Sequence, residues 1–373
     1  MFAVFCAALA AIGVWRGIFP FRISLRVKIA LSAAAVLFAF NLVFQLLLPR
    51  EWMPVWLILF LAFGYSVLLL YDILLVGYEL FYWAGRGVQR LRGREFPERR
   101  WRYARAGLLV PACAVVAFGM VNALKMPEVR EHDVVVPGLP PELDGMTVAL
   151  LTDIHSDRIV TGRRVRAIVD RTNARNPDLT VVVGDVVDRR VAVQRDAVRP
   201  LGDLRAKYGV YGVPGNHEYY AGYAEWMEFF NSIGVTMLEN RHVLIADGRI
   251  ALGGVTDPAA ERMDMEEPDV EKAFAGAPNG SMKLLLAHQP KLAPDALSAG
   301  VALQLSGHTH GGMVRGLDWI VAGANAGMVS GEYDYHGMKV FVSNGAGQWN
   351  GFPVRLGRDS EIALLRLRGA KGK

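Results

Sequence analysis

Three apolar stretches, each close to the length of a membrane span, lie within the first 125 residues of this 373-residue chain. They cover residues 29–48, about 56–78 and 106–124, and the first and third contain no charged residue. A bilayer core needs about 20 apolar residues in a helix, and helices that are apolar all round for this length are rare in soluble domains. We therefore expect these stretches to span a membrane, with buried core helices as the weaker alternative.

The N-terminal residues 1–15 are also free of charge but shorter. They would span only if the helix were tilted or continued past Arg16. A cleaved signal peptide is less attractive, because the basic region that should precede its apolar stretch is missing. Residues 1–125 are thus predicted to form an α-helical membrane region of three to four spans.

Positive charge is concentrated beside the apolar stretches. Residues 1–125 hold 14 Lys and Arg against 5 Asp and Glu, a net charge of +9, whereas the rest of the chain carries a net −4. This placement is typical of loops that orient membrane helices, and no nucleic-acid partner is expected. The basic residues fill two loops, formed by Arg16, Arg22, Arg26 and Lys28, and by Arg86, Arg90, Arg92, Arg94, Arg99, Arg100, Arg102 and Arg105.

Loops rich in Arg and Lys remain in the cytoplasm. The loop around Pro49, Arg50 and Glu51 carries no excess charge and is expected outside. The span at 106–124 then delivers the remainder of the chain to the outer face of the cytoplasmic membrane. If residues 1–15 do not span the membrane, only the predicted side of the N-terminus changes. The orientation of the other spans stays the same.

Asp72 is an ionisable residue inside the stretch 56–78. Such groups are costly in a membrane and often mark a functional site. A hydrogen bond between helices, or a position near the membrane surface, explains Asp72 equally well. The two cysteines, Cys6 and Cys113, lie in apolar segments, so the rest of the chain has no disulfide, thiolate metal site or catalytic cysteine.

The soluble part is expected to begin with a proline-containing linker at 126–143 that runs into a first strand, followed by a domain at 144–373. Short apolar runs recur in it at 147–151, 179–183, 209–213, 250–252, 284–287, 303–305 and 340–342. Their length and bounding polar residues predict buried strands. Residues 164–173 and 223–232 have helical periodicity, so the sequence predicts an α/β domain.

Five loops that follow these runs combine carboxylate, imidazole and amide groups. They read Asp153-Ile154-His155, Gly184-Asp185-Val186-Val187-Asp188, Gly215-Asn216-His217-Glu218, Ala287-His288-Gln289 and Gly307-His308-Thr309-His310. Open α/β sheets collect ligands in the loops beyond the carboxyl ends of their strands. Imidazole and carboxylate without thiolate suit Mn²⁺, Fe or Zn²⁺. Each motif alone is weak, but the five in order indicate a metal site.

This ordered set resembles the calcineurin-like metallophosphoesterase superfamily over about residues 147–345. The tail formed by residues 344–347 and 351–357 is similar to the bacterial membrane-associated branch related to the YkuE phosphoesterase. Met313 departs from that branch, in which Gln commonly follows the Gly-Gly pair, and this affects only a substrate-side detail. The resemblance implies a metallophosphoesterase-type layered β-sandwich flanked by helices.

The resemblance also implies two divalent cations, with Mn favoured over Fe or Zn. One would be held by Asp153, His155, Asp185 and His310, and the other by Asp185, Asn216, His288 and His308, so that Asp185 bridges them. His217 would be the acid that protonates the leaving oxygen. Asp188 and Glu218 are expected behind the ligands, where they orient them, although both could be exposed loop carboxylates. Arg355, like Arg189 and Arg190, is a weaker candidate for binding phosphate.

The expected function is a membrane-anchored hydrolase of phosphomonoesters or phosphodiesters that uses metal-activated hydroxide. Lipid-linked or envelope-derived substrates are expected. A pyrophosphatase-type hydrolase of a nucleotide-linked lipid is an alternative, but such substrates are usually cytoplasmic. A catalytically silent membrane sensor should lack a ligand or His217, and none is missing. A transporter, suggested by Asp72, would have a poor permeation path, and Ser156 has no partner base for a covalent route.

The arginine-rich loops generate a topological prediction. A reporter that is active only after export should be active when fused after Lys373, because the domain is expected on the outer face. A reporter that works only in the cytoplasm, fused at the same residue, serves as the control. Activity of that second reporter instead would overturn the predicted orientation and, with it, the preference for envelope substrates.

Overall fold

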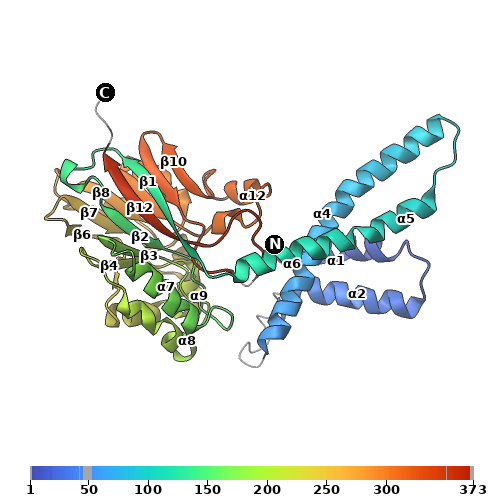
Figure 1. Ribbon diagram of the computed structural model, residues 1–373, viewed down its shortest axis with the longest axis horizontal. Helices are drawn as coiled ribbons and strands as arrows, with labels where there is room; N and C mark the ends of the chain where they lie inside the picture. Colours follow the sequence, from blue (N-terminus) through green and yellow to red (C-terminus); the bar gives the residue numbers. More distant parts are fainter. Residues whose placement is uncertain (1, 42, 45–52, 350, 370–373) are drawn as a thin grey trace. The chain divides into compact units, whose positions relative to one another are not determined.

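The computed structural model describes residues 2–41, 43–44, 53–349 and 351–369, which are drawn as ribbon in Figure 1. The chain divides into two compact units. Unit 1 comprises Met1–Asn122 together with Asn350–Val354, and unit 2 comprises Ala123–Trp349 together with Arg355–Lys373. Each unit is described by itself below.

Before residue 125 the described chain is helical. Its helices are α1 (Phe2–Ile12), a π-helical continuation (Gly13–Ile18), α2 (Leu25–Ala39), α4 (Val55–Leu91), α5 (Glu98–Gly107) and α6 (Leu109–Leu124). Within the described residues, two stretches are long and apolar enough to cross a membrane, namely Val55–Leu91 and Glu98–Leu124. With 37 residues, α4 is about 55 Å long and exceeds the bilayer core of about 30 Å.

The prediction of three to four spans is therefore not confirmed. The expected span 29–48 begins inside α2, which has only 15 residues, and its positions 42 and 45–48 lie outside the described residues. Residues Ala3–Ile18 form a shorter apolar helix. The expected outer loop at Pro49, Arg50 and Glu51 also lies outside the described residues.

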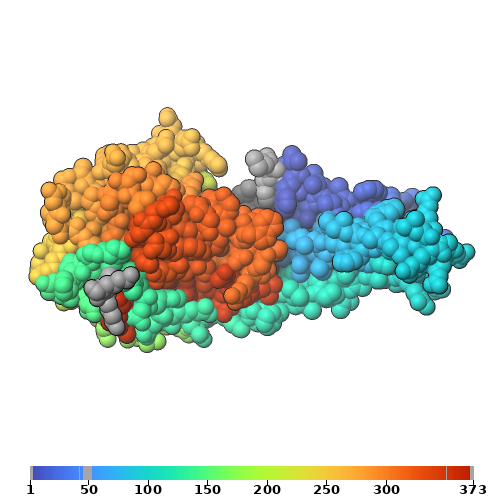
Figure 2. Space-filling view, turned by 90° about the horizontal axis from the view of Figure 1, so that it is seen from above, coloured from blue at the N-terminus to red at the C-terminus, as the bar shows by residue number. Residues whose placement is uncertain are grey.

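The helices of unit 1 pack through small and aromatic side chains. Leu9, Ala10, Ala39 and Tyr65 form a buried cluster where α1, α2 and α4 meet. Figure 2 shows these segments, coloured from dark to light blue, next to one another. Large apolar side chains of α4, such as Trp56 and Leu80, are exposed.

Unit 2 contains two mixed six-stranded sheets. The strands of the first sheet, in spatial order, are β1 (Glu128–Val136), β12 (Glu361–Gly369), β2 (Thr147–Leu151), β3 (Leu179–Val183), β4 (Val210–Val213) and β5 (Thr236–Met237). Those of the second are β10 (Gly331–Tyr335), β11 (Met338–Val342), β9 (Leu303–Ser306), β8 (Met282–Leu286), β7 (Ile250–Gly254) and β6 (Arg241–Ile245). Strands β2 to β5 run parallel, as do β7, β8, β9 and β11.

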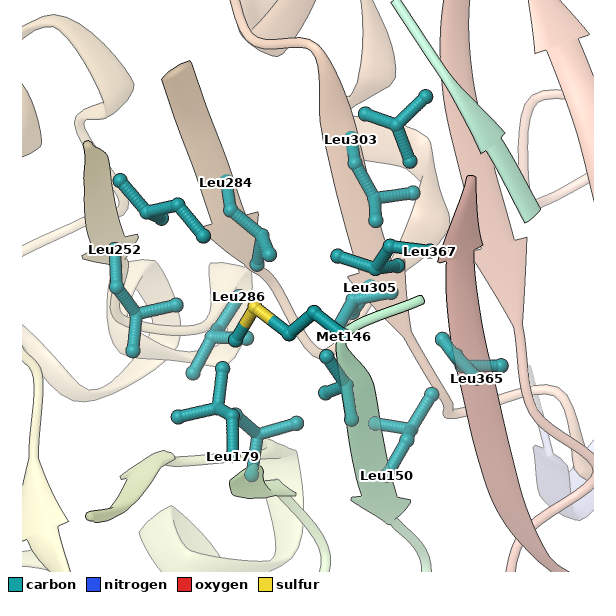
Figure 3. Close-up of a cluster of buried hydrophobic side chains, with 14 of the residues drawn as sticks. Met146, Leu150, Leu179, Leu252, Leu284, Leu286, Leu303, Leu305, Leu365 and Leu367 are labelled. Carbon is teal, nitrogen blue, oxygen red and sulfur yellow. The ribbon is translucent and has the colours of Figure 1, made fainter. Parts of the chain in front are cut away.

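The main core lies between the two sheets (Figure 3). Leu150 and Leu179 from the first sheet and Leu284 and Leu305 from the second belong to one cluster of fully buried side chains. Successive strand residues point to opposite faces, so Leu151, next to Leu150, belongs to a different cluster on the outer face. This alternation lets β2 contribute to two cores at once.

Helices cover the outer faces of both sheets. The first is covered by α7 (Gly162–Asn173), α8 (Val191–Val198) and α9 (Asn216–Ser232), with Trp226 and Phe230 of α9 in its cluster. The second is covered by α10 (Val270–Ala273) and α11 (Ala293–Ser298), whereas α12 (Asp318–Ala322) lies in a later loop. The predicted α/β fold is confirmed as two mixed sheets flanked by helices (Figure 1).

The seven expected strands are present, with ends that differ by at most two residues. Strand β1, however, occupies much of the segment 126–143, for which a linker leading into a strand was expected. It pairs in parallel with β12, more than 200 residues away in the sequence. Charged residues dominate the first part of β1, which is an edge strand, and its apolar run is confined to residues 134–136, so the sequence signal covers only its end.

Candidate metal centre

The polar loops of both sheets meet beyond the carboxyl ends of their strands. Asp153 and His155 follow β2, Asp185 follows β3, and Asn216 begins α9 after β4. His288 follows β8, and His308 and His310 follow β9. Because the strands in each group run parallel, their carboxyl ends share one edge of the sandwich.

Two groups of side chains converge at this edge. The ligand atoms of Asp153, His155 and His310 lie within 4.8 Å of one another, and so do those of Asp185, His288 and His308. A third combination of His155, Asp185 and His217 meets the same limit. Asp185 therefore lies within reach of both groups. Most of these side chains are buried, whereas His217 and His308 are partly exposed.

Ring nitrogens and carboxylate oxygens of the two groups face one another. In the first, Nε2 of His155 lies 3.0 Å from Nε2 of His310, which is 3.5 Å from Oδ1 of Asp153. In the second, Nε2 of His288 lies 3.2 Å from Oδ2 of Asp185 and 3.3 Å from Nδ1 of His308. The same Oδ2 of Asp185 is 3.7 Å from Nε2 of His155, which links the two groups.

The donor atoms fit divalent cations. The side-chain oxygen of Asn216 is buried and has no hydrogen-bond partner among the described residues. Buried polar atoms are rarely left without a partner, so this amide oxygen is available for a cation. Imidazole, carboxylate and amide together, without thiolate, match the preferences of Mn²⁺, Fe and Zn²⁺.

The backbone at the candidate ligands is strained. Asp153, His155, Asp185, His308 and His310 all have positive φ angles, between 48° and 69°. Residues with a side chain seldom adopt this left-handed conformation, which costs of order 1–3 kcal/mol each and persists where the surroundings enforce it. Five such residues at one edge indicate that the loops are shaped to aim side chains inward.

Glycines allow the loops to approach closely. Gly184 has φ +73°, and a Cβ there would lie 2.6 Å from both the amide nitrogen of Gly215 and Nδ1 of His288. A Cβ at Gly215 would overlap the carboxylate of Asp185. Gly184 and Gly215 are therefore required because no side chain fits where these two loops approach each other.

Hydrogen bonds behind the histidines fix their ring orientation. Nδ1 of His155 lies 2.7 Å from Oδ1 of Asp188, and Nδ1 of His288 lies 2.9 Å from the carbonyl oxygen of Val183. In each case the proton on Nδ1 is donated away from the centre, which leaves Nε2 free to bind a metal.

Glu218 joins two of the loops. Its carboxylate accepts hydrogen bonds from the backbone N–H groups of Asp185, Val186, Val187 and Gly215, at 2.7–3.3 Å. The side chain of Asp188 is only 5% exposed and Glu218 is buried, so neither is an exposed loop carboxylate. Glu218 therefore holds the loop after β3 against the start of α9.

His217 lies beside the centre, with 21% of its side chain exposed. Its Nδ1 is 2.7 Å from Oδ1 of Asp188, the same oxygen that binds His155, and its Nε2 is 4.0 Å from Oδ2 of Asp185. Tyr220, three residues later on the same face of α9, is half exposed and places its ring centre 5.6 Å from that of His217. Tyr220 was not predicted from the sequence as a site residue, although its spacing of three residues from His217 on a helix indicates that the two side chains are neighbours.

Opposing pKa shifts mark the centre. Burial and the charge of His288 lower the pKa of His308 to about 3, and burial with the charges of His155 and Arg355 holds the pKa of His310 well below its ordinary range. Both rings are therefore neutral and able to bind a cation. Burial alone would lower the pKa of His217, but the carboxylates of Asp185 and Asp188 outweigh it and raise the pKa to about 10.

Arg355 is buried, with 2% of its surface exposed. Its guanidinium donates to the carbonyl oxygens of Asn344, Gly347, His310 and Arg358, at 2.8–3.3 Å. These contacts fasten the tail of the domain to the loop of His310. They favour a structural role for Arg355 over the phosphate-binding role expected from the sequence.

Ser156 is also engaged in a structural contact. Its hydroxyl donates to the carbonyl oxygen of Val160 at 3.1 Å and accepts from the amide of Gln194 at 2.8 Å. The hydroxyl is fully buried, and this arrangement gives it no role as a nucleophile.

The shared oxygen of Asp188 generates a prediction. Asp188→Asn keeps the size of the side chain but removes the charge that orients His155 and His217, so metal affinity should fall about 10- to 100-fold. Titration of the metal-free protein with Mn²⁺ measures the change, and Asp203→Asn, at an exposed position, is the matched control. Unchanged affinity in Asp188→Asn would show that this carboxylate does not support the metal centre.

Comparison with known proteins places this centre in a family. The family model described as calcineurin-like phosphoesterase matches residues 146–312. A transmembrane protein with metallophosphoesterase domain from Danio rerio is 35% identical over 332 residues, covering 85% of this chain and 75% of that protein. A protein of the same name from Bos taurus is 36% identical over 309 residues, covering 79% of this chain and 68% of that protein.

The metallophosphoesterase YkuE of Bacillus subtilis is 27% identical over 293 residues, covering 75% of this chain and 99% of that protein. The matched region contains all five polar loops described above. With these identities and coverages, the chain belongs to the calcineurin-like phosphoesterase family and is a metal-dependent phosphoester hydrolase.

Proposed function

We propose that this chain is a membrane-anchored hydrolase of phosphomonoesters or phosphodiesters that works with two divalent cations. One observation carries the proposal: two groups of candidate ligands converge on a single buried carboxylate. Oδ2 of Asp185 lies 3.2 Å from Nε2 of His288 in one group and 3.7 Å from Nε2 of His155 in the other.

In this proposal Asp153, His155 and His310 hold one cation, Asn216, His288 and His308 hold the other, and Asp185 contacts both. Two divalent cations, when bound, neutralise phosphoryl oxygens and make hydroxide available near neutral pH. The mixture of imidazole, carboxylate and amide ligands suits Mn²⁺, Fe or Zn²⁺, of which we propose Mn²⁺. The side chains themselves provide a fixed geometry, because their rings are held from behind by Asp188 and Val183.

His217 is proposed as the acid that protonates the leaving oxygen. Asp188 holds its Nδ1, so Nε2 is left as the proton donor. The carboxylate of Asp188, 2.7 Å from Nδ1, stabilises the protonated ring, as an acid requires. Its partly exposed position, beside the half-exposed Tyr220, leaves it accessible to a substrate.

The membrane anchor is supported by two apolar helical stretches and by the names of the relatives from Danio rerio and Bos taurus. The distribution of arginine favours a catalytic domain on the outer face of the cytoplasmic membrane, reached by a multi-pass anchor. Substrates available to such an enzyme are lipid-linked or envelope-derived phosphoesters. The lipid bilayer is then the second partner of the chain.

The proposed bridge can be tested by metal analysis. Asp185→Asn should lower occupancy at both positions, because one carboxylate contributes to each, whereas Asn216→Ala should lower occupancy at one. Metal content per chain, measured after dialysis at low Mn²⁺, separates the two results. Two tightly bound ions in Asp185→Asn would mean that the bridging residue has been misassigned.

The role of His217 can be tested by comparing leaving groups. A positioned acid contributes about 10² to 10⁴ in rate, and less when the leaving group is already a stable anion. His217→Ala should retain both metals, lose most kcat on an alkyl phosphoester and lose far less on p-nitrophenyl phosphate. Equal losses on both substrates with intact metal content would refute the acid role, and loss of one metal would make His217 a ligand.

A further inference from the structure

Asp72 is buried in α4, with 4% of its surface exposed. Neither carboxylate oxygen has a hydrogen-bond partner among the described residues. The hydrogen bond between helices that would explain this residue structurally is therefore not found in the described part of unit 1. A buried polar group without a partner is costly, so its retention needs another explanation.

The carboxylate lines a cavity of about 310 Å³ between α1 and α4. Apart from Asp72, the walls are hydrocarbon, from Phe5, Ala8, Leu9, Ile12, Leu69, Ile73 and Val76. Both views of the chain show α1 against α4 (Figures 1 and 2). A volume near 300 Å³ is at the lower end of small-molecule sites, and an apolar wall with one polar group is the usual composition of such a site.

Gly13, just after α1, packs closely against the carboxyl group of Asp72. A Cβ at this position would lie 2.8 Å from Cδ1 of Leu68 and 3.3 Å from Oδ1 of Asp72. Any larger residue would therefore press on the helix pair and partly cover the carboxylate.

The cationic side chains in this part of unit 1 are already paired. Arg16 and Arg105 both bind Glu79, two turns of α4 beyond Asp72, and Arg105 lies 2.5 Å from its Oε1. Both arginines are therefore engaged by Glu79 rather than by Asp72. A neutral carboxyl both donates and accepts a hydrogen bond, and a hydroxyl group does the same.

We propose that this cavity is a binding site for the hydroxyl end of a long-chain alcohol dissolved in the membrane. The two oxygens of Asp72 would exchange hydrogen bonds with the hydroxyl, and the hydrocarbon chain would lie along Phe5, Leu9 and Ile12. The site is separate from the metal centre, and it stands whatever substrate that centre hydrolyses.

The test uses the full chain in phospholipid nanodiscs and a photoreactive alkane that labels the cavity. Decanol, its methyl ether and decylamine compete for labelling of the α1 and α4 peptides. Decanol should compete at about 3- to 10-fold lower concentration than the ether, as expected for one added hydrogen bond. Asp72→Leu should abolish this advantage, and Asp72→Asn, which still donates and accepts, should keep it.

Two further variants control for damage to the helices. Ser66→Ala removes a buried hydroxyl of α4 that donates to the carbonyl oxygen of Ala62 and does not line the cavity, so it should behave as the native chain. Ala8→Phe should fill the cavity and abolish labelling while leaving Asp72 in place. Equal competition by decanol and its ether in the native chain would overturn the proposal. So would an advantage of decylamine that disappears in Asp72→Asn, because that result identifies a cation site.

Discussion

The placement of one buried carboxylate, that of Asp185, organises the whole edge of the sandwich. Oδ1 accepts a hydrogen bond from the backbone N–H of His217 at 2.8 Å, and Oδ2 faces His288. The backbone N–H of Asp185 donates to Glu218 at 2.9 Å. Such a group is costly to bury unless positive charge surrounds it. The loops from both sheets satisfy this requirement, and the candidate metal ligands are brought together as a result.

The strained loops depend on the rigidity of the sheets beneath them. Left-handed residues such as Asp153 and His308 remain in place because the strands that carry them are anchored in the core between the sheets. Asp153 accepts hydrogen bonds from the backbone N–H of His308 through both carboxylate oxygens, at 3.0 Å each. The same contact ties the end of β2 to the end of β9, so the first and second sheets stay in register at the metal centre.

Local signals made the central strands and the candidate ligands predictable from the sequence. A run such as Leu179–Val183 is apolar except for Thr180 because β3 is buried on both faces, and the motif that follows it combines a glycine with carboxylates. Pairing between distant segments gives no such signal. The partnership of β1 with β12 depends on residues at opposite ends of the domain. The burial of Arg355 under four carbonyl groups depends on the folded tail.

The membrane part was less predictable for a related reason. Hydropathy gives the length of an apolar stretch but not where a helix ends: α2 ends at Ala39, and the remainder of the expected span lies partly outside the described residues. Hydropathy also identifies Asp72 as unusual, but it does not show whether another side chain forms a hydrogen bond or ion pair with its carboxyl group. Only the packing of α1 on α4 reveals the cavity beside that carboxylate.

The central claim is that one carboxylate joins two metal sites. Anomalous diffraction from crystals of the Mn²⁺-loaded chain tests it most directly. The account predicts two peaks, one at Asp153, His155 and His310 and one at Asn216, His288 and His308, with Asp185 in contact with both. A single peak, or a second peak bound by His217 instead of His288 and His308, would contradict it.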